Sequence, residues 1–368
     1  MADTEGHFAA IILADGSSSR MGTCNPLLSL SKQNFIHCIV TAYRDAGISR
    51  LFVVTGPQGE LVENGYRFLK RMSLFNKNCH RGIFASVIEG IKAIPSDVKA
   101  FFLHSSDTPF VRSSTLHHML TLWEDTSFLL YPVFQSKRGH PSLISSGMIS
   151  KILKRNRGNS LADLLKGETA QECFVPDQFI SYDVNTSSDF AAFSELYGTR
   201  HIPSQGECTE LFALAGTPKK IRDHCIVVEK VALRIASELP HFVPCDLQLV
   251  LKAALLHDIC RKSFRHADVG RLFLSKWGFS QIGELVGSHT DLLGETNSWE
   301  AKILYISDKF VKNFSVVPLE KRMREHLDRG RCGEASQKAL QRLQKAMEVQ
   351  EEIEKITGRN LLEIVKGL

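Results

Sequence analysis

The chain has 368 residues, 43% hydrophobic and 23% charged, a composition typical of globular proteins and a length that favours two domains. The net charge of +5 comes from lysines and arginines dispersed among nearly as many acids, which argues against a nucleic-acid binder. No apolar run reaches the roughly 20 residues needed to span a bilayer. The nine cysteines include no C-x-x-C pair, and the start "MADTEGHFAA" differs from a secretory signal. We therefore expect a reduced, cytoplasmic protein that binds neither nucleic acid nor membrane.

Residues 8 to about 196 alternate short apolar runs with amphipathic stretches of helical length. Runs such as "FAAIILA", "RLFVVTG", "AFFLHSSD" and "SFLLYPVF" are rich in Val, Ile, Leu and Phe and predict buried strands. The alternation predicts an α/β, Rossmann-like domain, a mostly parallel sheet with flanking helices, which we place at residues 1–200. Ligands of such sheets bind at the carboxyl ends of the strands.

A glycine- and serine-rich loop follows the first predicted strand. Its sequence, "LADGSSSRMG", offers backbone N–H groups, hydroxyls and a guanidinium, which together suit a phosphate. An ordinary strand-to-helix turn explains the same composition about equally well. The candidate phosphate-binding residues of this loop are Gly16, Ser17, Ser18, Ser19, Arg20 and Gly22.

Two later segments of the first half offer oxygen ligands for a metal. Asp107 follows the apolar run "AFFL", where a buried carboxylate is costly unless it meets a cation such as Mg²⁺. Asp183 and Asn185 alternate along "SYDVN", so they should face the same side, and either could supply a second oxygen. The alternative for each of the three residues is a helix cap or, for Asp107, a turn with Thr108 and Pro109.

Six segments of the first half, in this order, resemble the nucleotidyltransferases that act on molybdopterin cofactors, closest to the cytidylyltransferase branch. They are "LADGSSSRMGTCNPLL", "VVTG", "NKNCHRGIFASV", "SSDTPFV", "RGHPSLI" and "DVNTSSDF". The resemblance implies transfer of a nucleotidyl group from a nucleoside triphosphate to a phosphorylated acceptor, with release of pyrophosphate. It also implies a triphosphate site with Arg20 in a catalytic role, and Mg²⁺ at Asp107 assisted by Asp183 or Asn185.

The resemblance implies further binding residues by position. Those on the nucleotide or acceptor side are Leu13, Ala14, Asn25, Asn76, Gly82 and Ser86, and those on the acceptor side are Gly139 and His140. Two positions depart from the family pattern: Asn25 replaces a lysine that neutralises the triphosphate, and Asp15 replaces an alanine. A lost cation and an added carboxylate are electrostatically unfavourable beside a triphosphate. A degenerate domain that only binds nucleotide or cofactor is therefore an alternative.

The pattern of apolar and polar residues changes near "YGTRHIPSQGE", where Gly, Pro and Ser interrupt it. The sequence after this segment predicts helices and no strand, so we place a second, all-α domain at residues 201–368. Its segments carry His224, the pair His257 and Asp258 in "AALLHDIC", and Asp308 in "KILYISDKFV". The apolar context predicts that His257 and Asp258 lie on a helix against the core. A single histidine is more often a surface or satisfied core residue. Two imidazoles and two carboxylates together suit a shared Fe, Mn, Co, Zn or Mg ion.

Residues 216 to 330 resemble the HD-domain metal-dependent phosphohydrolases through "HCIVVEKVA", "ALLHDICRK", "HADVGRLF", "VGSHTDL" and "ILYISDKFV". They are close to the subgroup that hydrolyses dinucleoside polyphosphates and similar small phosphate esters. The resemblance implies metal ligands at His224, His257, Asp258 and Asp308, with Asp258 orienting or deprotonating the attacking water. It places His266 and His289 near the substrate phosphate or a second metal. Arg261 could contact a substrate phosphate, although a solvated helix end is the commoner explanation.

Together these features predict a cytoplasmic bifunctional enzyme that binds a nucleoside triphosphate and a phosphorylated small molecule of the molybdopterin type, with a molybdenum hydroxylase as a candidate partner. One alternative is a phosphohydrolase with a degenerate first domain. Another is a non-catalytic protein that delivers molybdenum cofactor, against which the intact set of HD-type ligands argues.

Overall fold

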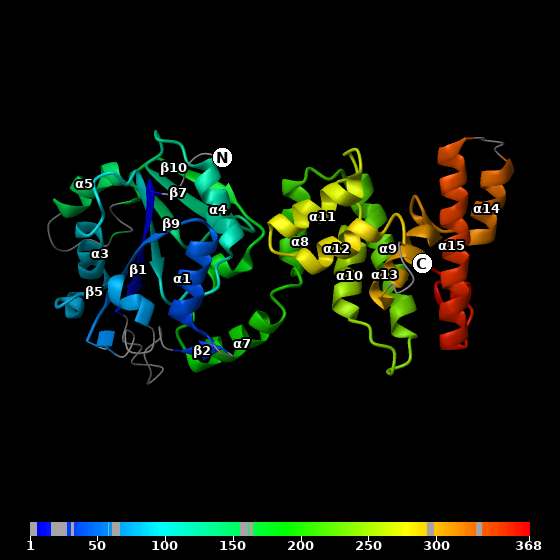
Figure 1. The fold of residues 1–368 in the computed structure, drawn as a ribbon, viewed down its shortest axis with the longest axis horizontal. Coiled ribbons are helices and arrows are strands. Elements are labelled where there is room, and N and C mark those ends of the chain that lie inside the picture. Colours follow the sequence, from blue (N-terminus) through cyan, green and yellow to red (C-terminus); the bar gives the residue numbers. More distant parts are fainter. Residues whose placement is uncertain are drawn as a thin grey trace. The chain divides into compact units, whose positions relative to one another are not determined.

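The computed structural model describes residues 6–15, 28–30, 33–57, 59–60, 67–154, 161, 165–292, 298–328 and 333–368. The chain divides into two compact units, Met1–Arg200 and His201–Leu368. The first unit is built around a sheet and the second from helices (Figure 1). This agrees with the predicted fold class of a mostly parallel α/β sheet followed by a helical region.

The sheet of the first unit has the strand order β10-β7-β9-β6-β1-β4-β5, with β8 paired to β7. Its pairings β1–β4, β1–β6, β4–β5 and β7–β10 are parallel, whereas β9 runs antiparallel to β6 and β7. The strands are β1 (Phe8–Ala14), β4 (Arg50–Thr55), β5 (Ser73–Phe75), β6 (Ala100–Ser105), β7 (Leu129–Phe134), β8 (Lys137–Arg138), β9 (Ser142–Ser145) and β10 (Ala170–Phe174). A separate ribbon pairs β2 (Ser29–Leu30) with β3 (Gln33–Asn34).

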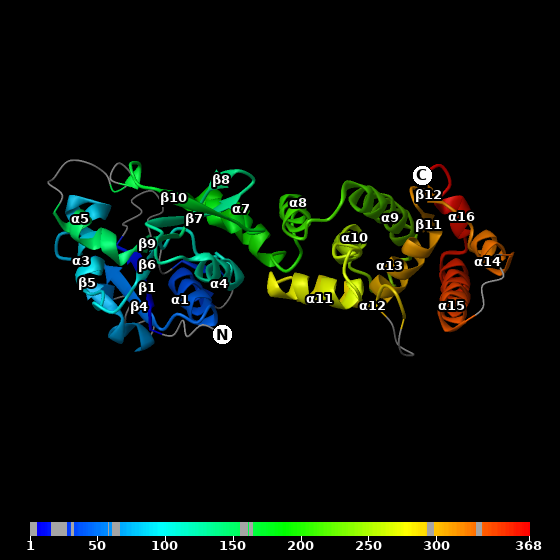
Figure 2. The ribbon, with the colours of Figure 1, turned by 90° about the horizontal axis from the view of Figure 1, so that it is seen from above.

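Helices cover both faces of this sheet, with α1 and α4 on one face and α3 and α5 on the other (Figure 2). Alternate β1 residues, among them Ile11 and Leu13, pack with Val87 and Ile91 of α3 in one core cluster. Gly90 lets α3 approach β1, because a Cβ there would collide with the side chain of Ile11. The elements are α1 (Phe35–Asp45), α3 (Ile83–Lys92), α4 (Ser113–Leu122), α5 (Ile149–Leu153), α7 (Ser187–Gly198) and the 3₁₀ helices η2 (Arg67–Arg71), η3 (Cys79–Arg81), η4 (Ser146–Met148) and η5 (Gln178–Ser181).

The parallel strands β1, β4 and β6 place their carboxyl ends at one edge of the sheet. Asp15 directly follows β1, Thr55 ends β4, and Asp107 lies two residues beyond β6. Polar side chains after parallel strands therefore meet at this edge, where open α/β sheets bind ligands.

The second unit packs helices around buried aliphatic and aromatic side chains, among them Val228, Leu256, Ile303 and Phe310. Its helices are α8 (Gln205–Leu214), α9 (Lys219–Ser237), α10 (Leu247–Leu256), α11 (His266–Lys276), α12 (Ser280–Ser288), α13 (Trp299–Phe310), α14 (Leu319–Asp328), α15 (Glu334–Thr357) and α16 (Leu361–Ile364). Within the described residues, no helix is both long enough and apolar enough to cross a lipid bilayer.

Two local predictions for the second unit were wrong. A short antiparallel hairpin, β11 (Val311–Lys312) with β12 (Ser315–Val316), occurs where no strand was predicted, because Asn313 turns the chain with a positive φ of 60°. In addition, α10 ends at Leu256, so His257 is its C-cap and Asp258 lies in the following turn. His257 keeps helical backbone angles, so the helical path continues through it before the turn that carries Asp258.

Candidate functional site

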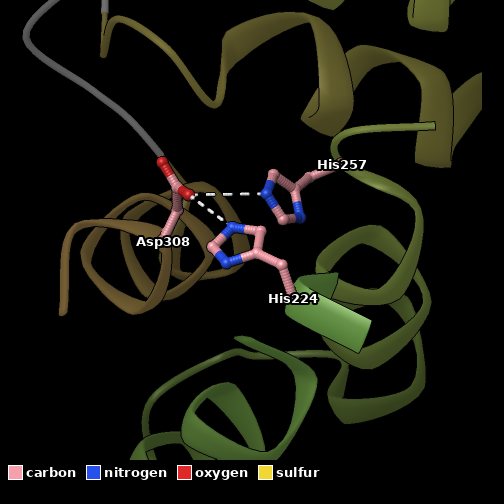
Figure 3. Close-up of side chains that lie close together, drawn as sticks. All are labelled: His224, His257 and Asp308. Carbon is pink, nitrogen blue, oxygen red and sulfur yellow. Dashed lines mark ion pairs between the residues drawn. The ribbon is translucent and has the colours of Figure 1, made fainter. Parts of the chain in front are cut away.

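Three side chains from separate helical segments converge in the second unit. His224 lies on α9, His257 caps α10, and Asp308 lies in the last turns of α13 (Figure 3). Oδ1 of Asp308 is 3.4 Å from Nε2 of His224 and 3.4 Å from Nε2 of His257. The two rings face the same carboxylate oxygen, so their Nε2 atoms and this oxygen surround one point.

The backbone determines which nitrogen of each ring carries a proton. Nδ1 of His257 lies 2.8 Å from the carbonyl oxygen of Ala254, and Nδ1 of His224 lies 3.0 Å from that of Asn313. His289, the C-cap of α12, repeats the arrangement with the carbonyl of Val286 at 2.5 Å. A carbonyl only accepts hydrogen bonds, so Nδ1 is the donor in each neutral ring and Nε2 keeps its lone pair.

The site contains a buried nitrogen that lacks a hydrogen bond. His257 is fully buried, and its Nε2 makes no hydrogen bond within the described part of the chain. An unsatisfied buried polar atom is costly, and a cation bound by the lone pair would remove that cost. Nitrogen lone pairs beside carboxylate oxygens suit divalent transition metals, so the residues present fit such an ion.

Asp258 links this cluster to two further histidines. One carboxylate oxygen, Oδ1, is 3.3 Å from Nε2 of His266 and 3.6 Å from Nε2 of His289. The other, Oδ2, is 3.6 Å from Nε2 of His257. His257, Asp258 and His289 thereby form a second metal-ligand grouping beside that of His224, His257 and Asp308, and the two share His257.

The electrostatics of the site keep both carboxylates ionised. Burial raises the pKa of Asp258, but the contacts with His266 and His289 and the charge of His257 outweigh it and hold that pKa well below its usual range. Burial likewise raises the pKa of Asp308, but Lys309, His224 and His257 outweigh it and hold that pKa far below the usual value of an aspartate. Burial lowers the pKa of His289, which favours its neutral form. Burial lowers the pKa of His257, but the neighbouring Cys225, Asp308 and Asp258 raise it well above its usual range, so the two anions form a cation-binding environment.

The cluster opens into a cavity of about 460 Å³. Of the side chains predicted from the sequence, His224, Asp258, Arg261, His266, His289 and Asp308 line it. Arg261 is directed into the site, since its Nη1 donates to Nε2 of His266 at 2.9 Å and lies 3.3 Å from Oδ1 of Asp258. The seven residues predicted for this half are therefore neighbours in space.

Five basic side chains of the lining were not predicted from the sequence: Lys309, Lys312, Arg322, His326 and Arg342. Lys309 directly follows Asp308, and its Nζ lies 2.7 Å from Oδ2 of that carboxylate. A lysine beside a predicted metal-binding acid could have been noticed. The others lie in the hairpin β11–β12 or on α14 and α15, which no motif connects to the site.

In the first unit, two residues predicted to line the nucleotide or acceptor side bond to one another. Nδ2 of Asn76 donates to Oγ of Ser86 at 2.7 Å, and the Ser86 hydroxyl donates to the carboxylate of Asp15. Asn76 and Ser86 are fully buried, and burial raises the pKa of Asp15. Asp15, the residue that replaces a family alanine, thus meets the very side chains predicted to face the ligand.

Asp107 and Asp183 also lie close to one another. Partial burial and the like charge of Asp107 raise the pKa of Asp183. The backbone N–H of Val184 donates to the carbonyl oxygen of Asp107 at 2.9 Å, which ties the two segments together. None of the three predicted oxygen ligands caps a helix: Arg112 is the N-cap of α4 and Thr186 that of α7. Asn185 is exposed, and its backbone N–H donates to Asp189.

The remaining predicted residues of the first unit are scattered or undescribed. Leu13 and Ala14 are buried at the end of β1, and Gly82 is the exposed N-cap of α3. Gly139 is packed against the backbone of Ile180, which leaves no space for a side chain, and His140 beside it is exposed. Gly16, Ser17, Ser18, Ser19, Arg20, Gly22 and Asn25 lie outside the described residues.

Two family models match the chain. Residues 10–173 match the MobA-like NTP transferase domain, and residues 221–313 match the HD domain. A curated relative, the tRNA (cytidine(56)-2'-O)-methyltransferase of Picrophilus torridus, is 28% identical over 190 residues, which cover 46% of this chain and 52% of the relative. The chain thus spans about half the length of this relative.

Similar solved structures include a nucleotidyl transferase from Methanothermobacter thermautotroptrophicus (20% identity, 53% of this chain and 99% of that chain, TM-score 0.46). Rv0371c from Mycobacterium tuberculosis in complex with manganese is 18% identical, covering 51% and 98%, with a TM-score of 0.45. Molybdopterin-guanine dinucleotide biosynthesis protein A from Archaeoglobus fulgidus is 15% identical, covering 52% and 99%, with a TM-score of 0.39.

Proposed function

Because the chain joins an N-terminal MobA-like NTP transferase domain to a C-terminal HD domain, we propose that it is a bifunctional enzyme. Residues 1–200 transfer a nucleotidyl group from a nucleoside triphosphate to a phosphorylated acceptor of the molybdopterin type. Residues 201–368 hydrolyse a phosphate ester with the help of a divalent metal. In this proposal, one domain makes a nucleotide-linked product and the other removes a phosphorylated side product.

The observation that carries the hydrolase proposal is the shared direction of the imidazole lone pairs. The protonated Nδ1 atoms of His224 and His257 are held by backbone carbonyls, and both Nε2 atoms face Oδ1 of Asp308 at 3.4 Å. We assign His224, His257, Asp258 and Asp308 as the metal ligands. When bound there, an ion such as Fe, Mn, Co or Zn supplies Lewis-acid polarisation of a phosphoryl oxygen and acidifies water.

The residues of this chain perform the remaining steps. Asp258 accepts a hydrogen bond from the attacking water and orients it; the new P–O bond forms as the ester P–O bond breaks, and the proton of the water passes to the leaving oxygen. His266 and His289 position that carboxylate, since both Nε2 atoms lie within 3.6 Å of its Oδ1. Lys309 neutralises Oδ2 of Asp308 from 2.7 Å, which limits the charge repulsion on an incoming phosphate.

For the transferase half, the carboxyl end of β6 supports the proposed metal site. Asp107 and Asp183 are close enough for one to raise the pKa of the other, a pairing that a bound Mg²⁺ would stabilise, with Asn185 as an alternative oxygen donor. Positioning and charge neutralisation, with Arg20 on the triphosphate, are what such an in-line transfer requires.

A second candidate, a hydrolase whose first domain binds nucleotide or cofactor without transferring it, is favoured by the contacts of Asp15. Its carboxylate accepts from Ser86, which in turn accepts from Asn76, so these groups are already satisfied without a ligand. The substitution Asn25→Lys separates the candidates. A jump in transferase turnover supports a weakened enzyme, and unchanged absence of turnover supports a binding module.

The first experiment measures bound metal together with phosphate release from nucleotides and dinucleoside polyphosphates. We expect Asp258→Ala to abolish both. Asp268→Ala serves as the matched control, because this carboxylate pairs with Arg265 and lies outside the cavity lining. If the wild type binds no metal and releases no phosphate after reconstitution with Mn²⁺, Fe²⁺, Co²⁺ or Zn²⁺, the hydrolase proposal is wrong.

A further inference from the structure

The cavity over the histidine cluster extends beyond the segment that matches the HD domain. That match ends at residue 313, whereas one wall of the cavity is formed by side chains from α14 and α15. These later residues are Arg322, Glu325, His326, Ala339, Arg342 and Leu343. This wall is therefore contributed by residues that follow the match to the HD domain model.

The lysines and arginines of this cavity differ in whether they have a carboxylate partner. Arg261 pairs with Asp258, and Lys309 pairs with Asp308. Lys312 pairs with Glu325, and Nε and Nη2 of Arg342 donate to the two carboxylate oxygens of Asp291. Arg322 is the exception, because it forms no ion pair with any residue in the described ranges.

Arg322 is nevertheless held firmly. Its Nη1 donates to the carbonyl oxygen of Lys309 and to that of Val311 at 3.3 Å, so its position is fixed beside the end of α13, next to Asp308. The side chain is half-buried, and no hydrogen bond from Nε or Nη2 is present within the described residues. A guanidinium with one edge anchored and a second edge open is arranged for a bidentate contact with an oxyanion.

We propose that Arg322 binds a second anionic group of the substrate, a phosphoryl group adjacent to the one that is hydrolysed. This inference rests on the proposed hydrolase function. It makes α14 a specificity element: the HD site accepts a compound with linked phosphoryl groups in preference to a simple monoester. Asp308 and Glu325 attract this guanidinium without forming an ion pair with it, so its open edge remains available to such a substrate.

The test uses the full chain loaded with Mn²⁺, with hydrolysis of p-nitrophenyl phosphate as the readout and free Mn²⁺ held constant. Inorganic phosphate and inorganic tripolyphosphate serve as competitive inhibitors with one and with three linked groups. We expect Arg322→Gln to raise the inhibition constant of tripolyphosphate by about 10- to 100-fold, the usual effect of losing a charge-assisted pair of hydrogen bonds. The constant for inorganic phosphate should change less than about threefold, and the bound metal should be unchanged.

Two further variants separate recognition from a structural role. Arg324→Gln, on the same helix but exposed and outside this cavity, should leave both constants unchanged. Arg322→Lys keeps the charge but lacks the guanidinium fork, so it should raise the inhibition constant of tripolyphosphate by an intermediate factor. This variant still tests the proposal if Arg322→Gln misfolds and loses its metal.

The outcomes are distinct. Equal effects of Arg322→Gln on both inhibitors, or no effect of either Arg322 variant on tripolyphosphate, overturn the role of Arg322 and leave the hydrolase proposal intact. If the wild type, like Asp258→Ala, releases no product from p-nitrophenyl phosphate, nucleotides or dinucleoside polyphosphates with any of the divalent metals, the proposed function itself is overturned, and this inference with it.

Discussion

Oδ1 of Asp308 lies 3.4 Å from Nε2 of His257, a fully buried nitrogen that makes no hydrogen bond in the described part of the chain. The same oxygen lies 3.4 Å from Nε2 of His224. One carboxylate thus connects α13 to the two other helical segments of the site. The surroundings keep it ionised, so it attracts a cation to the point where the two lone pairs meet.

The first prediction concerns metal binding at this carboxylate. We expect Asp308→Asn to lose the bound metal, because an amide oxygen is a weaker ligand than a carboxylate oxygen. At a metal concentration 100 times the dissociation constant, binding should increase the unfolding free energy of the wild type by about 3 kcal/mol and so raise its unfolding temperature. The metal should not change the unfolding temperature of the variant. Metal analysis and thermal unfolding with and without Mn²⁺ check this. Asp268→Asn is the control, and equal metal content in Asp308→Asn and wild type would contradict the prediction.

The second prediction concerns Asp15 and nucleotide binding. The Asp15 carboxylate meets Ser86 at the carboxyl edge of the sheet, where a triphosphate is proposed to bind. We expect Asp15→Ala to increase the affinity for Mg²⁺-loaded CTP or GTP several-fold, because it removes a repulsive charge and frees the Ser86 hydroxyl. Calorimetric titration measures the change, with Asp45→Ala, an exposed acid at the end of α1, as the control. Weaker nucleotide binding in Asp15→Ala would assign Asp15 a favourable role in the site.

The third prediction concerns the stability of the first unit at low pH. His104 is buried, with Nδ1 2.9 Å from the Tyr43 hydroxyl and Nε2 2.9 Å from the carbonyl oxygen of Thr108. Burial lowers the pKa of His104 to about 4. In the unfolded chain this pKa is near 6.5, so between these values the unfolded state binds more protons. Stability is therefore lost as the pH falls from about 6.5 to about 4, by roughly 3 kcal/mol for this group.

Two measurements check the behaviour of His104. Its ring resonances should titrate near pH 4, well below the ordinary histidine range. The loss of unfolding free energy between pH 7 and pH 4.5 should be smaller in His104→Gln than in wild type. A His104 resonance that titrates near pH 6.5 would show that the buried environment does not disfavour the charged ring.

The fourth prediction concerns Asp177, which ties the segment before Asp183 to the start of α4. Its fully buried carboxylate accepts from the backbone N–H of Arg112 at 2.8 Å, from the Thr115 hydroxyl at 2.7 Å and from the N–H of Phe179 at 3.1 Å. Asp177→Ala leaves these donors unsatisfied, so we expect a loss of about 2–5 kcal/mol in unfolding free energy. The exposed Asp97, paired with Arg50, is the control, and its removal should leave the unfolding midpoint nearly unchanged. Equal effects of the two variants would contradict this account.

The arrangement of strands and helices could largely be predicted from local pattern. Runs such as Phe8–Ala14 and Ala100–Ser105 predict buried parallel strands, because they are apolar along almost their whole length. The hairpin β11–β12 could not be predicted in this way, because a strand of two residues is too short to show an alternating pattern of apolar and polar residues. The exact end of α10 at Leu256 was missed as well, because the apolar pattern continues through Ile259 although the helix does not.

Of the candidate sites, the sequence predicted the groups that lie in motifs and missed those that depend on tertiary contacts. His224, His257 and Asp308 are separated by up to 84 residues; His257 and Asp308 lie in apolar contexts that make a buried polar group unusual, whereas His224 lies between the charged run KKIRD and the apolar run CIVV. Arg322 has no such context, since its neighbours on α14 are mostly charged. The contact of Asp15 with Ser86 joins residues 71 positions apart and becomes apparent only when β1 and α3 are packed together.

The backbone carbonyls that hold Nδ1 of His224, His257 and His289 have a consequence for how the site acquires its ion. Each carbonyl belongs to a helix end or to a hairpin of the folded chain, so the ring orientations are set by folding and do not depend on the ion. Little conformational entropy then remains to be lost on metal binding. The folded polypeptide should accept, release and exchange its ion as an intact receptor, with loading limited by diffusion and ligand exchange and independent of refolding.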